Sequence, residues 1–155
     1  GLTGIPKHIA RLRNLEKLDL SNNRLISLPP ELFELSNLKE LNLTGNRIVR
    51  IGNDIGNLVQ LEVLIAPGNQ IKDISENIGT LPRLRKLVLF RNRLSTLPAS
   101  ISKLGTLEEI DLASNLFSEI PAALTVMGNL RSLSLRNNRL TEFPAGLIDW
   151  FGLLE

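Results

Sequence analysis

Residues 84–106 read LRKLVLFRNRLSTLPASISKLGT. Leucines recur before Asn92 at spacings of three and two, and apolar residues recur after it at spacings of about three. The alternation through Leu87 and Leu89 favours a very short β-strand with both leucines pointing inward. Pro98 lacks a backbone donor and ends strand pairing, and the apolar spacing that follows predicts a 3₁₀ or short helical return.

The same pattern recurs with a constant period of 23 residues along the whole chain. The asparagine position is occupied six times, at Asn23, Asn46, Asn69, Asn92, Asn115 and Asn138. A constant period of this length is typical of a solenoid with one coil per repeat. We expect a single domain over residues 1–155 with about six and a half repeats, divided into units 1–14 (partial), 15–37, 38–60, 61–83, 84–106, 107–129, 130–152 and 153–155 (partial).

Identical paths between successive strands predict a parallel sheet along one side of the solenoid. Each asparagine follows a strand, and its amide can satisfy backbone groups left unpaired in the bend. Repetition would stack these amides into a ladder. Because the helical return is wider than the strand spacing of roughly 4.8 Å, we expect a curved α/β solenoid with the sheet on its concave face.

Composition excludes several classes of function. The chain has 33 leucines, no cysteine and one histidine, so no disulfide framework, zinc site or multi-histidine metal site is expected. The net charge of +2 is no nucleic-acid signature, and the apolar runs are too short to cross a membrane. No phosphate-binding glycine motif is present. His8 and the pair Glu108–Glu109 are expected to be solvated, so we expect neither enzyme activity nor a cofactor.

These units resemble the leucine-rich repeat in its 23-residue intracellular form, L-x-x-L-x-L-x-x-N-x-L-x-x-L-P-x-x-I-x-x-L. The resemblance covers the whole chain. It is to the subclass found in Ras-suppressor-like, Shoc-type and Roco-type proteins, and it implies a cytoplasmic protein in signalling or scaffolding. The third unit departs from the pattern, with Ala66 in place of leucine and with Gly52 and Ser75 where prolines are expected near its borders.

The two ends of the chain fall within repeats. No polar cap is recognisable at either end, so we expect a piece of a longer solenoid. The aromatic residues of the segment Asp149-Trp150-Phe151 fill the core or begin a docking surface.

The register of the repeats also predicts which side chains face outward from the strands. One outward column alternates in charge, so its residues could form ion pairs with one another across neighbouring strands. It consists of Glu16, Lys39, Glu62, Arg85, Glu108 and Arg131. A second column, at the residue after the asparagine, holds Arg24, Arg47, Arg93 and Arg139, and could bind phosphate or acidic protein.

An apolar cluster interrupts the mostly polar outward columns. Val63, Ile65, Val88 and Phe90 come from two adjacent units. The basic residues that border them are Lys86, Arg85, Arg91 and Arg93, and Pro67 adjoins them. An apolar centre with a charged rim is typical of a protein-binding site, although strand propensity also explains valine and isoleucine there.

We therefore predict a non-catalytic module that binds a protein or peptide on its concave face, with no nucleic-acid or membrane partner. The resemblance adds a small GTPase or a domain of the same parent chain as candidate partners. Two alternatives stay open. The chain could be the regulatory repeat segment of a larger signalling enzyme, such as a Roco-type GTPase or a kinase, or it could associate with copies of itself.

Overall fold

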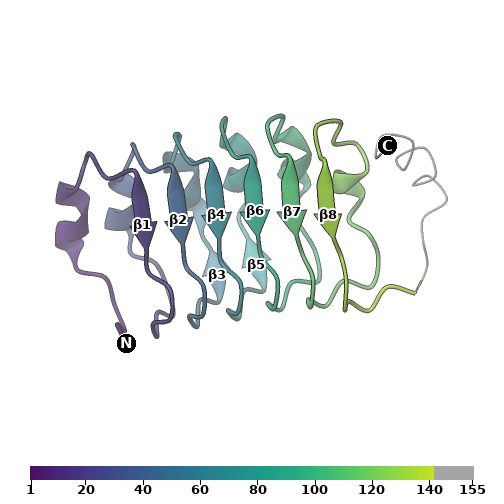
Figure 1. The fold of residues 1–155 in the computed structure, drawn as a ribbon, viewed down its shortest axis with the longest axis horizontal. Coiled ribbons are helices and arrows are strands. Elements are labelled where there is room, and N and C mark those ends of the chain that lie inside the picture. Colours follow the sequence, from purple (N-terminus) through teal and green to yellow (C-terminus); the bar gives the residue numbers. More distant parts are fainter. Residues whose placement is uncertain (142–155) are drawn as a thin grey trace.

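The structure, a computed structural model, describes residues 1–141 as a solenoid. Six short parallel strands lie side by side in one sheet (Figure 1), in the order β1 (Lys17–Asp19), β2 (Glu40–Asn42), β4 (Val63–Ile65), β6 (Lys86–Val88), β7 (Glu109–Asp111) and β8 (Ser132–Ser134). The predicted leucine-rich-repeat solenoid is confirmed. The expectations for Asp149, Trp150, Phe151 and the partial unit 153–155 lie outside the described residues.

Every pair of neighbouring strands has the same register. Leu18 lies opposite Leu41, Leu41 opposite Leu64, and Leu64 opposite Leu87, each 23 residues further along the chain. The repeat length is therefore also the length of one coil. Equivalent side chains consequently form straight columns across the sheet.

In residues 1–141 the return paths contain 3₁₀ helices, as the apolar spacing predicts. The six helices in the described part of the chain are η1 (Lys7–Arg11), η2 (Pro30–Glu34), η3 (Asn53–Asn57), η4 (Glu76–Thr80), η5 (Ala99–Lys103) and η6 (Ala122–Leu124). Prolines 6, 29, 98 and 121 precede four of them at the N-cap, where the missing donor does no harm.

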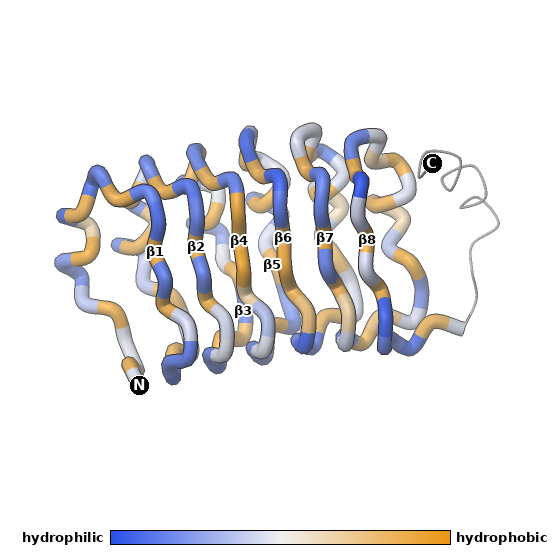
Figure 2. Tube along the Cα trace, viewed as in Figure 1, coloured by the Kyte–Doolittle hydropathy of each residue, from blue (hydrophilic) through white to orange (hydrophobic). Residues whose placement is uncertain are grey.

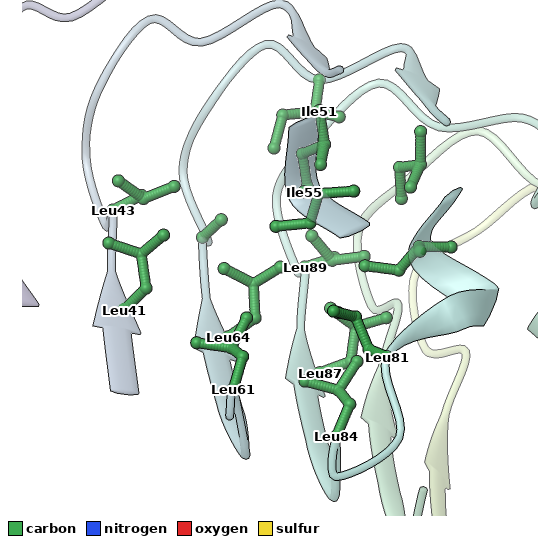
Figure 3. Close-up of a cluster of buried hydrophobic side chains, with 14 of the residues drawn as sticks. Leu41, Leu43, Ile51, Ile55, Leu61, Leu64, Leu81, Leu84, Leu87 and Leu89 are labelled. Carbon is green, nitrogen blue, oxygen red and sulfur yellow. The ribbon is translucent and has the colours of Figure 1, made fainter. Parts of the chain in front are cut away.

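The hydrophobic core lies between the sheet and these helices. Leucines from the strands, including Leu41, Leu64 and Leu87, meet residues of the return path such as Ile55 and Leu81 (Figure 3). Each of these side chains is at most 2% exposed. Removal of this apolar surface from water is the main force that holds successive coils together.

A second, two-stranded sheet forms where the third unit departs from the repeat pattern. Strand β3 (Arg50–Ile51) pairs in parallel with β5 (Asp73–Ile74), and the backbone N–H of Ser75 donates to the carbonyl of Ile51 at 2.9 Å. Proline at position 75 could not make this bond. Pro98 stands at the equivalent position of the next unit, so the pairing cannot extend there in the same way.

Candidate binding face

The predicted apolar cluster lies on the face of the six-stranded sheet that points away from the hydrophobic core, here called the outer face. This is the face predicted to be concave. Val63 and Ile65 flank Leu64 in β4, and both are partly exposed whereas Leu64 is completely buried. The register places Val63 beside Lys86 and Ile65 beside Val88. In Figure 2 the tube is hydrophobic along β4 and along the later part of β6, whereas β1 and β2 are largely hydrophilic.

Val88 differs from the exposed contact residue that the alternation predicts. It is only 8% exposed, although it does not belong to the contiguous leucine core. The register places Ile65 on one side of it and Asp111 on the other. Val88 is therefore largely covered by its neighbours and contributes little to the accessible surface. The apolar contact surface consists mainly of Val63, Ile65 and Phe90, each partly exposed.

The basic residues that border the apolar cluster, Arg85, Lys86 and Arg91, differ in whether they form ion pairs. Lys86 contacts Glu109 at 2.9 Å, so its charge is already partly balanced. Arg85 and Arg91 are exposed, and neither makes an ion pair within residues 1–141. Arg91 also has a backbone φ of 54°, in the left-handed region that side chains other than glycine and asparagine rarely adopt.

The repeat position that has a left-handed backbone conformation could have been identified from the sequence. It directly precedes each ladder asparagine and is occupied by Asn22, Gly45, Gly68, Arg91, Ser114 and Asn137, all with positive φ. Asparagine and glycine in four of these six places are the residue types that tolerate this conformation. The arginine at position 91 is therefore held on the rim in a less favourable backbone conformation.

Ion pairs across the sheet only partly follow the predicted column. Lys39 and Glu16 are 2.9 Å apart, but none of Glu62, Arg85, Glu108 and Arg131 forms an ion pair in the described part of the chain. The other two pairs on this face, Lys17–Glu40 and Lys86–Glu109, belong to the neighbouring outward column. The hydrogen bond from Lys17 to Glu40 raises the pKa of the lysine.

The six asparagines that follow the strands of the large sheet form one column of hydrogen bonds. The amide nitrogen of Asn92 donates to the carbonyl oxygens of Leu89 and Ala66, each at 2.9 Å, and its oxygen accepts from Ile71 N at 3.0 Å. The same three bonds recur around Asn46, Asn69, Asn115 and Asn138. This column fixes the bend that follows each strand and thereby the outer face.

Two contacts on the helical side were not foreseen from the sequence. The carboxylate of Glu76 accepts hydrogen bonds from Ala99 N at 3.1 Å and Ser100 N at 2.9 Å in the next coil. These bonds, led by Ser100, lower the pKa of Glu76. Gly79 lies so close to Ser100 that a Cβ built on it would be 2.4 Å from the Ser100 carbonyl oxygen. Neither residue shows a repeated pattern that would reveal the contact.

The described residues offer little chemistry for catalysis. No group of three or more His, Cys, Asp or Glu side chains in residues 1–141 could hold a metal ion. His8 is exposed in η1. A cavity of about 540 Å³ lies beside β3 and β5 and is lined by residues such as Arg50, Asp73 and Asn77, but Arg50 and Asp73 are paired with each other at 2.7 Å. No helix in this part of the chain has the length and apolar character that crossing a bilayer requires.

Comparison with known proteins gives consistent family matches. The model for the leucine rich repeat matches residues 13–71 and 82–144, and the model for two copies of leucine rich repeats matches residues 59–102. No curated protein matches the chain.

Three solved structures illustrate the structural similarity. A leucine-rich-repeat protein of Leptospira interrogans is 31% identical with a TM-score of 0.85, and the match covers 99% of this chain and 44% of that one. The ectodomain of the Arabidopsis thaliana receptor kinase GASSHO1/SCHENGEN3, in complex with CASPARIAN STRIP INTEGRITY FACTOR 2, is 37% identical with a TM-score of 0.82; the match covers 94% of this chain and 18% of that one. The plant peptide hormone receptor RGFR1, in complex with RGF2, is 32% identical with a TM-score of 0.72, and the match covers 88% and 27%.

Proposed function

Because the chain belongs to the leucine-rich-repeat family, we propose that it is a non-catalytic module that binds a protein or peptide on the outer face of its six-stranded sheet. The family is generally one of interaction modules. The observation that carries the proposal is the apolar surface of Val63, Ile65 and Phe90 beside the exposed Arg85 and Arg91, which form no ion pair within residues 1–141. An apolar centre surrounded by polar groups is the usual anatomy of a protein-binding site.

Rigidity is the mechanism by which this face would bind. The constant register and the asparagine column hold the strands in one arrangement before any partner arrives. A preformed surface loses less conformational entropy on association than a flexible one. More of the interaction energy is then available for affinity.

The two plant structures support a peptide or protein as the partner, since both are receptors solved in complex with another factor. This chain spans less than half of each of the three solved structures described above.

The test is binding of an isolated partner to face and control variants. Phe90→Ala is expected to weaken binding by roughly 1 to 3 kcal/mol, the usual range for an apolar anchor, and Phe90→Asp should weaken it further. Val126, which is 71% exposed on the helical side, supplies the matched control Val126→Asp. Calorimetry on partners captured with the wild-type chain measures the effect. Equal affinity of wild type and Phe90→Asp would remove this face from the proposal.

The finer assignment follows the repeat subclass. The 23-residue period and the absence of cysteine in the sequence support a cytoplasmic signalling or scaffolding protein of the Ras-suppressor, Shoc or Roco type, with a small GTPase or a domain of the parent chain as partner. Expression of the parent protein with a fluorescent tag tests the location. Secretion or a cell-surface position would contradict it.

A second candidate is the regulatory repeat segment of a larger signalling enzyme. The match to the ectodomain of a receptor kinase, of which this chain covers 18%, favours this reading. An enzyme domain in the parent gene, and altered activity of that enzyme in a Phe90→Asp variant, are the expected results. Association of the chain with itself is a third candidate, which sedimentation across a range of concentrations tests directly.

A further inference from the structure

The turns that follow the six strands of the large sheet carry charges of one sign only. These turns are residues 21–26, 44–49, 67–72, 90–95, 113–118 and 136–141, and Figure 1 shows them along the same edge of the sheet. They contain no aspartate or glutamate. Their basic residues, which we call the basic edge, are Arg24, Arg47, Lys72, Arg91, Arg93, Arg136 and Arg139.

All seven side chains of the basic edge are exposed. Within residues 1–141 none of them lies within 4.0 Å of a carboxylate, since the five ion pairs involve other residues. Three acidic residues next to these turns are already occupied: Asp73 binds Arg50, while Asp19 and Asp111 accept the backbone N–H groups two residues further on. The exposed Glu119 follows the turn 113–118, which holds none of the seven basic residues.

The fold brings these charges together at close and fixed spacing. The backbone N–H groups of Arg47 and Arg93 each donate to the preceding coil, to Leu25 O at 2.8 Å and Ile71 O at 2.9 Å. Neighbouring coils are about 4.8 Å apart on the strand side. The net charge of the chain is only +2, so this edge reflects a separation of charge. Five of the six turns hold at least one of these residues. Like charges in neighbouring turns repel one another, and an anionic partner would relieve the repulsion.

We propose that the basic edge binds an extended, acidic peptide segment of a partner protein. The six turns span roughly 24 Å along the sheet, which matches about seven residues of extended chain. Carboxylates along such a segment would meet the arginines, whose planar groups bind carboxylates in pairs of hydrogen bonds. Arg91 follows Phe90 directly, so the edge borders the proposed binding face.

A peptide fits this edge better than a nucleic acid. Binding of single strands needs aromatic side chains on which bases stack. The described turns contain two aromatic residues: Phe117 is completely buried, and Phe90 is only partly exposed. Phe90 alone gives one ring, whereas successive bases of a strand would need aromatic side chains in several turns.

Fluorescence anisotropy with labelled octaglutamate tests the proposal, at salt concentrations from about 50 mM upward. The edge variant is Arg47→Gln, Lys72→Gln and Arg93→Gln combined. The control variant combines Arg11→Gln, Arg13→Gln and Arg83→Gln, which removes the same charge from exposed residues outside the turns. Circular dichroism melts establish that both variants fold. An eight-nucleotide oligothymidine serves as the competing class of ligand.

We expect the edge variant to bind octaglutamate at least about fivefold more weakly and the control variant less than about twofold. The salt dependence should also be shallower for the edge variant. Equal losses in both variants, no binding at low salt, or tighter and edge-dependent binding of oligothymidine would overturn the proposal. Phe90→Ala should leave octaglutamate binding unchanged, so this result is independent of the proposed binding face.

Discussion

At the scale of single residues, the asparagine after each strand of the large sheet has a role that its side chain alone can fill. Asn92 gives one acceptor to Ile71 N and two donor bonds to the carbonyls of Leu89 and Ala66, while it is only 7% exposed. A side-chain amide of this length supplies both kinds of group. Aspartate would lack the donors, and leucine would lack both.

Asn92→Ala leaves the buried Ile71 N–H without a partner. The carbonyls of Leu89 and Ala66 each lose one donor but keep the amide nitrogen of Asn115 or Asn69. We expect the free energy of unfolding to fall by about 1–3 kcal/mol, the usual cost of one unsatisfied buried polar group. Urea denaturation followed by circular dichroism measures the change. Asn57→Ala, at an exposed asparagine in η3, is the control and should change stability by less than about 0.5 kcal/mol. Similar losses in the two variants would contradict the role of the column.

At the scale of elements, neighbouring 3₁₀ helices stabilise each other. Such short helices have few internal hydrogen bonds, so their free backbone groups need outside partners. Glu76 of η4 accepts from the first two N–H groups of η5, and the hydroxyl of Ser100 donates to the Glu76 carbonyl at 2.6 Å. Gly79 permits this close approach because it has no side chain.

Gly79→Ala tests the close approach between η4 and η5. The added methyl group would overlap the backbone of Ser100, so either the coils separate or the helix shifts. We expect a loss of about 1–3 kcal/mol in the free energy of unfolding, the usual cost of overpacking. Gly105→Ala is the matched control, since a Cβ there meets no atom within 4 Å. A neutral effect at Gly79 would show that the coils adjust freely at this point.

The pKa shift of Glu76 predicts a pH dependence of stability. Its pKa is lowered from the ordinary 4.5 in the folded protein, chiefly by the Ser100 N–H bond. The carboxylate therefore contributes stability above pH 4.5, and this contribution is lost as pH falls through the folded pKa.

Thermal melts of wild type and Glu76→Gln between about pH 3 and pH 7 check this dependence. Gln has one acceptor oxygen where the carboxylate uses two, so the variant should melt at a lower temperature near neutral pH. The difference should shrink as the solution becomes more acidic. Glu34→Gln, at an exposed carboxylate in η2, is the control. If the difference in melting temperature between the two proteins stays constant with pH, the charge of Glu76 does not contribute to the contact with Ala99 and Ser100.

At the scale of the whole molecule, the constant register converts a sequence column into a surface. Residues at the same outward position of adjacent units lie on neighbouring strands. Residues that depart from the repeat pattern in adjacent units are therefore also neighbours in space. This places Val63, Ile65 and Phe90 together and gathers the seven basic residues on one edge. In a solenoid such surfaces extend along the axis, which suits elongated partners.

Periodicity in the sequence determined much of the architecture of this protein. The 23-residue spacing of leucines and asparagines is enough to derive parallel strands, inward leucines, a 3₁₀ return path and the direction of the outward side chains. These follow from backbone geometry and from the need to bury apolar residues, which every repeat shares. The apolar cluster could also be predicted from the sequence, because the repeat register shows which side chains point outward from the strands.

Only the tertiary structure decided which contacts form between neighbouring coils. The burial of Val88, the two-stranded sheet of β3 and β5, and the hydrogen bonds of Glu76 to the next coil each depend on the particular residues that face one another across two units. Ion pairing on the sheet likewise depends on which long side chains reach each other. A repeat pattern specifies positions along one coil, whereas these features arise from packing between the unlike side chains of two coils.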